Sequence, residues 1–191
     1  MTLLLRVGHA LGPFHPAPGE SARHHVVRVG WETPKLVGEA ERTAWEHALG
    51  HPDPGTDPAV VDALVARGLV ARVDDTREAR IAFARAHRVQ PLGMGTLTTE
   101  DGGRVLGTWS RPSATTDPEA FDIWAWAHLF PTLEAAAAGL AGASSVADTG
   151  GPQPPTGDAV LDRLLDRLPE LLAAELVYLD VPRDAVDEPR P

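Results

Sequence analysis

Residues 57–80 read DPAVVDALVARGLVARVDDTREAR, and this stretch is the most informative part of the sequence for the fold. Asp57 is a helix-capping residue, and Pro58 follows at the first helical position, where its missing N–H has no cost. Apolar residues recur at helical spacing as far as Gly68, which can end a helix in the left-handed conformation. Residues 69–73 then alternate as in a strand. The stretch therefore predicts a helix, a tight stop and a strand.

The flanking sequence continues this mixture of helices and strands. Upstream, residues 24–29 are rich in β-branched valine and predict a strand, with a return strand over residues 35–37. A helix is expected from Gly38 to Gly50, where Gly50 supplies the left-handed stop. Downstream, residues 77–87 return to helical spacing.

The second half of the sequence predicts a hairpin followed by helices. Residues 100–103 (EDGG) separate two alternating runs, which indicates a β-hairpin. Asp117 and the following proline start a helix that is apolar on almost all sides. Residues 142–157 are rich in Gly, Pro, Ser and Thr and predict a linker, and residues 158–181 predict a last helix with a leucine stripe. No internal repeat is visible.

The order strand, helix, loop, helix, strand over residues 24–75 resembles a winged helix. Residues 57–80, with the Arg-Gly-Leu-Val end of their helix, are similar to the recognition helix and wing of MarR-type regulators. The same order is also similar to PqqD-like peptide-binding winged helices, which add a peptide strand to an exposed sheet edge. The first resemblance implies a regulator that binds DNA, and the second implies a protein that binds peptides.

The predicted fold class is α+β, with a winged-helix-like N-terminal part of short strands, a β-hairpin and a helical C-terminal part. We expect a winged-helix-like domain over residues 1–90 and the hairpin with the apolar helices over residues 91–141. A flexible linker over 142–157 and an amphipathic helix over 158–181 complete the chain. With 191 residues, of which 43% are hydrophobic, the chain can bury a substantial core.

Charge is unevenly distributed along the chain. Residues 1–111 carry 13 Lys+Arg and 13 Asp+Glu, whereas residues 112–191 carry 4 against 14, so the acidic second half supplies the net charge of −10. Such a surface repels nucleic acid and suits a basic partner. The first leucine run is far shorter than a signal peptide, and no stretch approaches a membrane span, so we expect a cytoplasmic protein with no membrane contact. The preference for arginine over lysine indicates a bacterial, GC-rich origin.

Four arginines of the winged-helix-like part are candidates for contact with DNA or with a partner: Arg67, Arg72, Arg77 and Arg80. The start of the candidate recognition helix is acidic, however, with Asp57 and, one turn further, Asp62. Carboxylates cannot donate to bases or phosphates and are repelled by DNA. DNA binding is therefore the less favoured prediction.

No motif in the sequence specifies a reaction. Because there are no cysteines, thiol nucleophiles and thiolate zinc sites are excluded. His47 and His51 are four residues apart, but the glycine and proline around them interrupt the helix that a metal pair requires. The G-x-S-x-G, G-x-G-x-x-G and phosphate-loop motifs are absent. We predict no metal, no cofactor and no catalytic residues.

Two apolar features predict an interface. One is the leucine stripe of the last helix, whose candidate interface residues are Leu161, Leu165, Leu168 and Leu172. It packs either on the chain's own core or on a partner chain. The other is Trp124 and Trp126, which point in different directions on one helix, so that one can face a neighbouring subunit.

The sequence favours a non-catalytic bacterial winged-helix protein that acts through protein or peptide contacts as a homodimer, with a regulator as one form of such a protein. The first alternative is a winged-helix transcriptional regulator that binds DNA. The second is an enzyme or small-molecule binder with a cavity under the aromatic helix.

Overall fold

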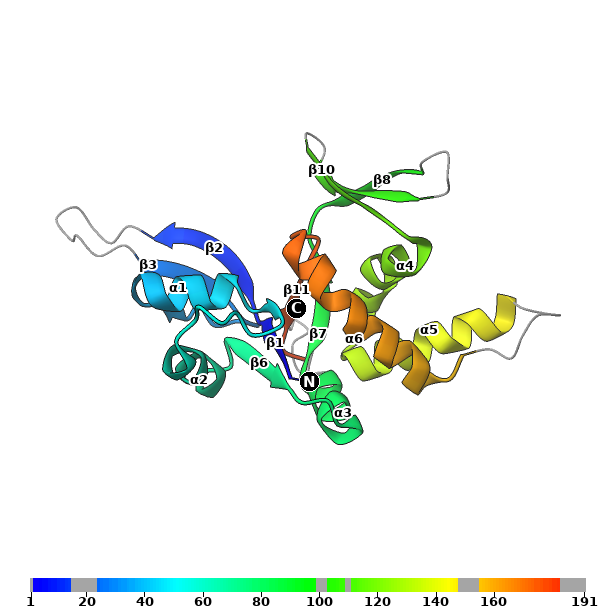
Figure 1. Cartoon of the computed structure of the whole chain (residues 1–191). Coiled ribbons are helices and arrows are strands. Elements are labelled where there is room, and N and C mark those ends of the chain that lie inside the picture. The colour runs from blue at the N-terminus through cyan, green and yellow to red at the C-terminus, as the bar shows by residue number, and fades with distance from the viewer. Residues whose placement is uncertain (1, 15–23, 99–102, 109–110, 148–154, 183–191) are drawn as a thin grey trace, which may run out of the picture. The chain divides into compact units, whose positions relative to one another are not determined.

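The computed structural model describes residues 2–14, 24–98, 103–108, 111–147 and 155–182 (Figure 1). The chain forms two compact units, residues 1–80 and 81–191. In the described residues, six α-helices and one 3-10 turn accompany four small antiparallel sheets. The α+β class is confirmed. The unit boundary lies close to the predicted end of the first domain, but the hairpin, the apolar helices and the last helix all belong to the second unit.

Unit 1 contains β1 (Leu3–Arg6), β2 (His9–Phe14), β3 (His24–Arg28), β4 (Lys35–Leu36), α1 (Gly38–Glu46), β5 (Leu49–Gly50), α2 (Pro58–Ala66) and β6 (Val70–Val73). Strands β2, β3 and β4 form a meander, and β1 lies between β5 and β6 in a second sheet. Helix α3 (Arg77–Ala86) spans the boundary between the units.

The helix predicted from residues 57–80 is confirmed. The carboxylate of Asp57 accepts a hydrogen bond from the Ala59 N–H at 2.9 Å. At the other end Gly68 has φ +68°. The N–H groups of Gly68 and Leu69 then return to carbonyls of the last helical turn. These local bonds explain why capping signals were sufficient to locate α2.

One expectation for unit 1 is wrong. Helix α1 ends at Glu46 rather than Gly50, because Gly50 belongs to β5, where it pairs with Leu4 of β1. The predicted strand after α2 is present as β6, which pairs antiparallel with β1 and is followed by α3. The strand after α2 therefore closes a sheet with the start of the chain.

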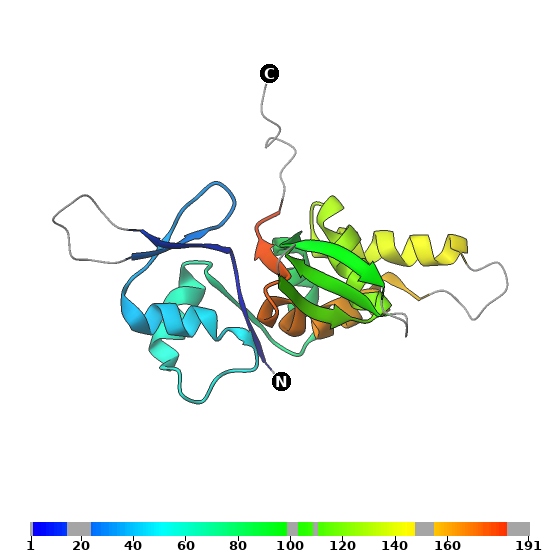
Figure 2. The same cartoon turned by 90° about the horizontal axis from the view of Figure 1, so that it is seen from above.

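Unit 2 contains β7 (Arg88–Pro91), β8 (Met94–Thr98), β9 (Arg104–Thr108), β10 (Arg111–Thr116), α4 (Pro118–Trp126), η1 (Ala127–Leu129), α5 (Leu133–Ala147), α6 (Gly157–Ala173) and β11 (Val177–Asp180). The predicted hairpin is confirmed as β8 and β9, which with β10 form a second meander, seen as three adjacent green strands in Figure 2. Its loop, residues 99–102, lies outside the described residues.

The predicted linker and last helix need correction. Helix α5 continues to Ala147, so the first part of residues 142–157 is helical, and residues 148–154 lie outside the described residues. Helix α6 ends at Ala173 instead of continuing to residue 181. Glu175 adopts φ +55°, a conformation that ends the helix and that glutamate gives no reason to expect. The chain then forms β11, which pairs with β7.

The two units have the same order of elements, which the sequence did not reveal. In each, a strand leads into a three-stranded meander, then a helix that carries a tryptophan, then a helix whose end passes into a final strand. The final strand pairs antiparallel with the first, beginning with Leu3 opposite Val73 in unit 1 and Arg88 opposite Asp180 in unit 2. The likeness extends to single hydrogen bonds.

In each unit, the residue after the first strand donates the same backbone hydrogen bond. Val7 donates to the carbonyl of Leu69 at 2.9 Å, and Leu92 donates to the carbonyl of Leu176 at 2.6 Å. Leu69 and Leu176 occupy the same place, immediately after the left-handed residue that ends α2 or α6. The two helix ends and the two sheets therefore correspond residue by residue.

The carbonyls of these residues also have equivalent partners. The indole Nε1 of Trp45 donates to the Val7 carbonyl at 3.0 Å, and that of Trp124 donates to the Leu92 carbonyl at 3.2 Å. Each bond fixes the tryptophan-bearing helix, α1 or α4, to the end of the first strand of its own unit.

A glycine follows in both units, with φ +99° at Gly8 and +75° at Gly93. A Cβ would lie 2.8 Å from the Arg28 carbonyl oxygen at Gly8 and 2.5 Å from the Gly107 carbonyl oxygen at Gly93. Both positions thus require glycine for conformation and for space. The following strands, β2 and β8, each contain an irregularity in their pairing with the middle strand. Unit 2 is therefore a second copy of the architecture of unit 1.

The copies differ in the connection between the tryptophan-bearing helix and the last helix. In unit 1 this connection is β5 and the short loop of residues 51–57. In unit 2 it is much longer and includes η1, α5 and the first turns of α6.

Candidate functional site

A cavity of about 300 Å³ opens in unit 1 between α1, the loop of residues 51–57 and α2. Its apolar wall is formed by the buried side chains of Leu4, Ala44, Ala48 and Val61. Pro52 and Pro54 of the loop and Pro58 of α2 complete this wall. The volume is at the lower end of the range for ligand pockets and suits a single large side chain or a small molecule.

Polar groups stand at the rim of the cavity. His47 Nδ1 lies 3.0 Å from Asp53 Oδ2, and Asp53 Oδ1 accepts from the Gly55 N–H at 2.9 Å. The Gly55 N–H, followed by His47, holds the pKa of Asp53 below its ordinary value, so this carboxyl is ionised at neutral pH. On the other side, Arg72 Nη2 donates to Asp62 at 2.5 Å. The rim therefore offers donors and acceptors close together.

The His47–Asp53 pair at this cavity is open to solvent. His47 and Asp53 have 53% and 38% of their side chains exposed, so water screens the pair and gives it little of the desolvation that tunes catalytic groups. The hydroxyls on the lining belong to Thr2 and Thr56. Thr2 donates to Asp74 at 3.0 Å, away from the histidine. Among the described residues that line the cavity, no nucleophile, base and orienting group converge.

This cavity lies beside α1, in the other unit from the apolar helix α4, under which the second alternative placed a cavity. Within the described residues, no group of three or more His, Cys, Asp or Glu side chains is arranged to hold a metal ion.

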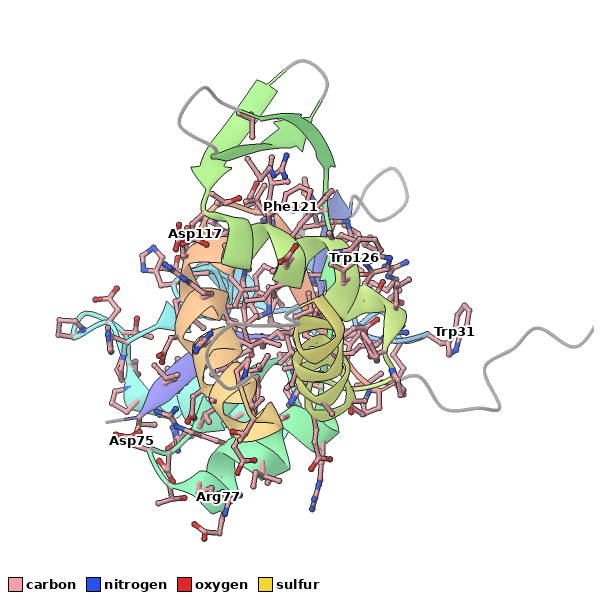
Figure 3. All side chains as sticks on the ribbon, turned by 90° about the vertical axis from the view of Figure 1, so that its right-hand side faces the viewer. Trp31, Asp75, Arg77, Asp117, Phe121 and Trp126 are labelled. Carbon is pink, nitrogen blue, oxygen red and sulfur yellow. The ribbon has the colours of Figure 1, made fainter. Side chains whose placement is uncertain are left out.

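Most of the predicted contact arginines are engaged in ion pairs. The pairs are Arg67 with Glu41 (2.8 Å), Arg72 with Asp62 (2.5 Å) and Arg80 with Asp75 (2.7 Å). Arg67 also donates to the backbone carbonyl of Lys35. Arg77 is the first residue of α3 and lies near Asp75 in Figure 3. Phosphates would therefore compete with carboxylates for three of the four arginines.

The prediction that the leucines of the last helix form an interface is wrong, because their side chains are buried within unit 2. Its four residues, Leu161, Leu165, Leu168 and Leu172, are between 0% and 5% exposed. They lie on the inner face of α6, which packs against α5 and contacts α4. Of the two possibilities that the stripe left open, packing on the chain's own core is the one observed.

The two tryptophans of α4 have different environments. Trp124 is half-buried, with its indole bonded to Leu92 and its ring 5.6 Å from that of Phe121. Trp126 is 52% exposed, and Leu129 beside it on η1 is 64% exposed. Trp126 is therefore the predicted interface residue that reaches the surface in the described part of the chain (Figure 3).

A surface residue that sequence reasoning missed is Trp31, which is 81% exposed. Val29 and Glu32 bond each other's backbone in both directions at 3.0 Å, and this leaves Gly30 and Trp31 at the tip of a tight turn. Gly30 has φ +55°, as such a turn requires. The sequence did contain a signal for this exposed residue, namely the Gly-Trp pair between two predicted strands. A turn at this place normally carries polar residues, so a tryptophan there is unusual. In Figure 3 the ring points away from its ribbon.

Comparisons with protein-family models, with curated proteins and with solved structures found no match for this chain. The winged-helix resemblance therefore rests on the sequence pattern alone. In the described part of the chain, none of the helices has the length and apolar character needed to span a membrane.

Proposed function

We propose that this protein acts without catalysis, through contacts with other polypeptides. The observation that carries the proposal is Trp31, a large apolar side chain that is 81% exposed on a tight turn. Tryptophan is enriched among the residues that dominate binding energy at protein interfaces. Burial of this indole by a partner would gain the hydrophobic free energy that the isolated chain forgoes.

The turn itself supports this role. The reciprocal backbone bonds between Val29 and Glu32 fix the turn before any partner arrives. A contact residue that is already ordered loses little conformational entropy on binding, so more of the contact energy appears as affinity. Unit 1 exposes two further large apolar side chains, Leu11 at 53% and Val37 at 61%.

The electrostatics favour a polypeptide over DNA. The net charge is −10, and three of the four candidate arginines are paired with carboxylates. Binding to DNA depends on cationic side chains that neutralise phosphates and so release the counterions of the DNA. These three arginines already neutralise carboxylates of the protein.

The proposal is tested by selecting peptides from a displayed library on the full chain and measuring their affinity by fluorescence polarisation. Trp31→Ala should weaken the selected peptides by at least about tenfold, as for a residue at an interface centre. Trp31→Phe should weaken them less, because it keeps an aromatic ring at the same position. Sedimentation equilibrium of the same variants shows whether the partner is a second copy of the chain.

Two results would overturn the proposal. One is a set of selected peptides whose affinity is the same with and without the Trp31 indole. The other is salt-dependent binding to duplex DNA at low-micromolar affinity, reduced by Arg72→Ala and Arg77→Ala, which would establish the nucleic-acid alternative.

A further inference from the structure

The correspondence between the two units extends to the wall of the unit 1 cavity. Leu4, paired with Arg72, corresponds to Val89, which is paired with Leu179. Ala44 directly precedes Trp45, as Ile123 precedes Trp124, and Ala48 and Ala127 follow those tryptophans at the same distance. On the last helix, Val61 lies one turn before Leu64, as Leu168 lies one turn before Leu171. Each apolar wall residue thus has a counterpart in unit 2.

In unit 2 the equivalent residues are buried. The four counterparts, Val89, Ile123, Ala127 and Leu168, are between 0% and 3% exposed. The inserted helix α5 packs along α6 and contacts η1, the elements that carry Leu168 and Ala127. Its first residue, Leu133, is fully buried, and Ala136 and Ala137 are buried as well. In unit 2 the inserted helix therefore packs on two elements whose equivalents in unit 1 line the cavity.

One hydrogen bond places the start of α5 against the counterpart of the cavity rim. The N–H of Leu133 donates to the carbonyl of His87 at 2.8 Å. His87 directly precedes β7, as Thr2 directly precedes β1, and Thr2 lines the cavity of unit 1. Leu133 thus enters unit 2 at a position equivalent to the cavity of unit 1.

From this comparison we infer that the unit 1 cavity binds a leucine-like side chain of a partner polypeptide, as unit 2 holds Leu133 of its own α5. The inference rests on the proposed function in taking a polypeptide as the partner. The cavity volume of about 300 Å³ accommodates one such side chain. The rim groups His47, Asp53 and Arg72 provide donors and acceptors for the N–H and C=O groups on either side of it.

The test uses the full chain and a blocked peptide of residues 131–140 (PTLEAAAAGL), which presents Leu133 in its own sequence. The matched control peptide carries Leu133→Ala. The methyl NMR signals of Ala44, Ala48 and Val61 report on the cavity. The leucine peptide should shift these signals in a saturable way, and the alanine peptide should bind at least about tenfold more weakly because it buries less apolar surface.

A pair of variants on one helix sharpens the result. Val61→Phe places a ring in the cavity and should abolish the shifts, whereas Ala63→Phe, on an exposed position of α2, should leave them unchanged. If Val61→Phe does not fold, the two peptides still decide the question in the unmodified chain. Equal binding of both peptides, or shifts confined to other methyl groups, would overturn the inference. Saturable binding of indole in the cavity without binding of the leucine peptide would also overturn it, in favour of a small-molecule site.

The outcome is independent of the test of Trp31. Trp31→Ala should not change the binding of the residue 131–140 peptide, since Trp31 does not line the cavity. If the leucine peptide does not bind in the cavity but the selected peptides still depend on Trp31, only this inference is refuted. Cavity binding without any Trp31-dependent partner would instead refute the role of the turn.

Discussion

The indole nitrogen of Trp45 donates to the carbonyl of Val7 at 3.0 Å, and this bond fastens α1 to the end of β1. Trp45 is only 3% exposed, so the carbonyl is shielded from water where the indole covers it. Trp124 and Leu92 repeat the arrangement in unit 2. The same bond in both copies identifies it as a structural feature of the repeated architecture.

Replacing Trp45 by Phe should destabilise the protein by about 1–3 kcal/mol, because a buried carbonyl loses its donor. The free energy of unfolding from urea titration, followed by circular dichroism, measures the loss. The control is Trp126→Phe at an exposed position, where the change should stay within about 0.5 kcal/mol. Equal effects of the two substitutions would contradict the role assigned to the bond.

Gly8→Ala and Gly93→Ala should each destabilise the protein by more than about 3 kcal/mol, since both strain and a backbone clash are introduced. The new Cβ would lie within 2.8 Å of the Arg28 carbonyl oxygen or 2.5 Å of the Gly107 carbonyl oxygen. Gly12 provides the control, because its φ is +91° but no atom lies within 4 Å of the position that a Cβ would take there. Gly12→Ala should cost only the strain, about 1 kcal/mol. Thermal unfolding curves that rank Gly12→Ala with the other two would refute the argument from space.

The ends of α2 and α6 allow a reciprocal test of the left-handed stop. Gly68→Ala should destabilise the protein by about 1 kcal/mol, because φ is +68° and no neighbouring atom interferes. Glu175→Gly should stabilise it by about 0.5–1 kcal/mol, because φ +55° strains a glutamate. Chemical denaturation of both variants checks the opposite signs. A destabilised Glu175→Gly would mean that contacts of the glutamate outweigh its backbone strain.

Burial lowers the pKa of His87 below its ordinary value of 6.5, against the smaller opposing effect of the Phe83 carbonyl at 3.0 Å. The unfolded chain therefore binds a proton more readily than the folded one. The stability associated with neutral His87 is complete above about pH 6.5 and falls as the pH drops below it. His87→Gln should flatten the dependence of unfolding free energy on pH between about 7 and 5. A wild-type slope in His87→Gln would contradict the assignment.

Several elements could be predicted from sequence because their signals are local. The Asp-Pro starts of α2 and α4 and the Gly68 stop each depend on hydrogen bonds within one helical turn. Strands β3, β4, β8 and β9 of the meanders also followed from alternation and turn signals, whereas β2 and β10 were not predicted. Among exposed candidate contact residues, the sequence supplied Trp126 but missed Trp31, because a turn residue carries no periodicity.

The sequence by itself determined the α+β class, the position of most helices and the position of several strands. Only the tertiary structure decided that β6 returns to β1, that the leucines of α6 face their own core, and that unit 2 repeats unit 1. The two units share their strand register, the indole hydrogen bond to a backbone carbonyl and the left-handed residue at the end of the last helix. Most of these features constrain the backbone and leave the side chains free to differ. Glu175 can therefore replace Gly68, and α5 can be inserted, without loss of the architecture. The cavity follows from the same cause, since it lies where one copy has the inserted helix and the other has a short loop.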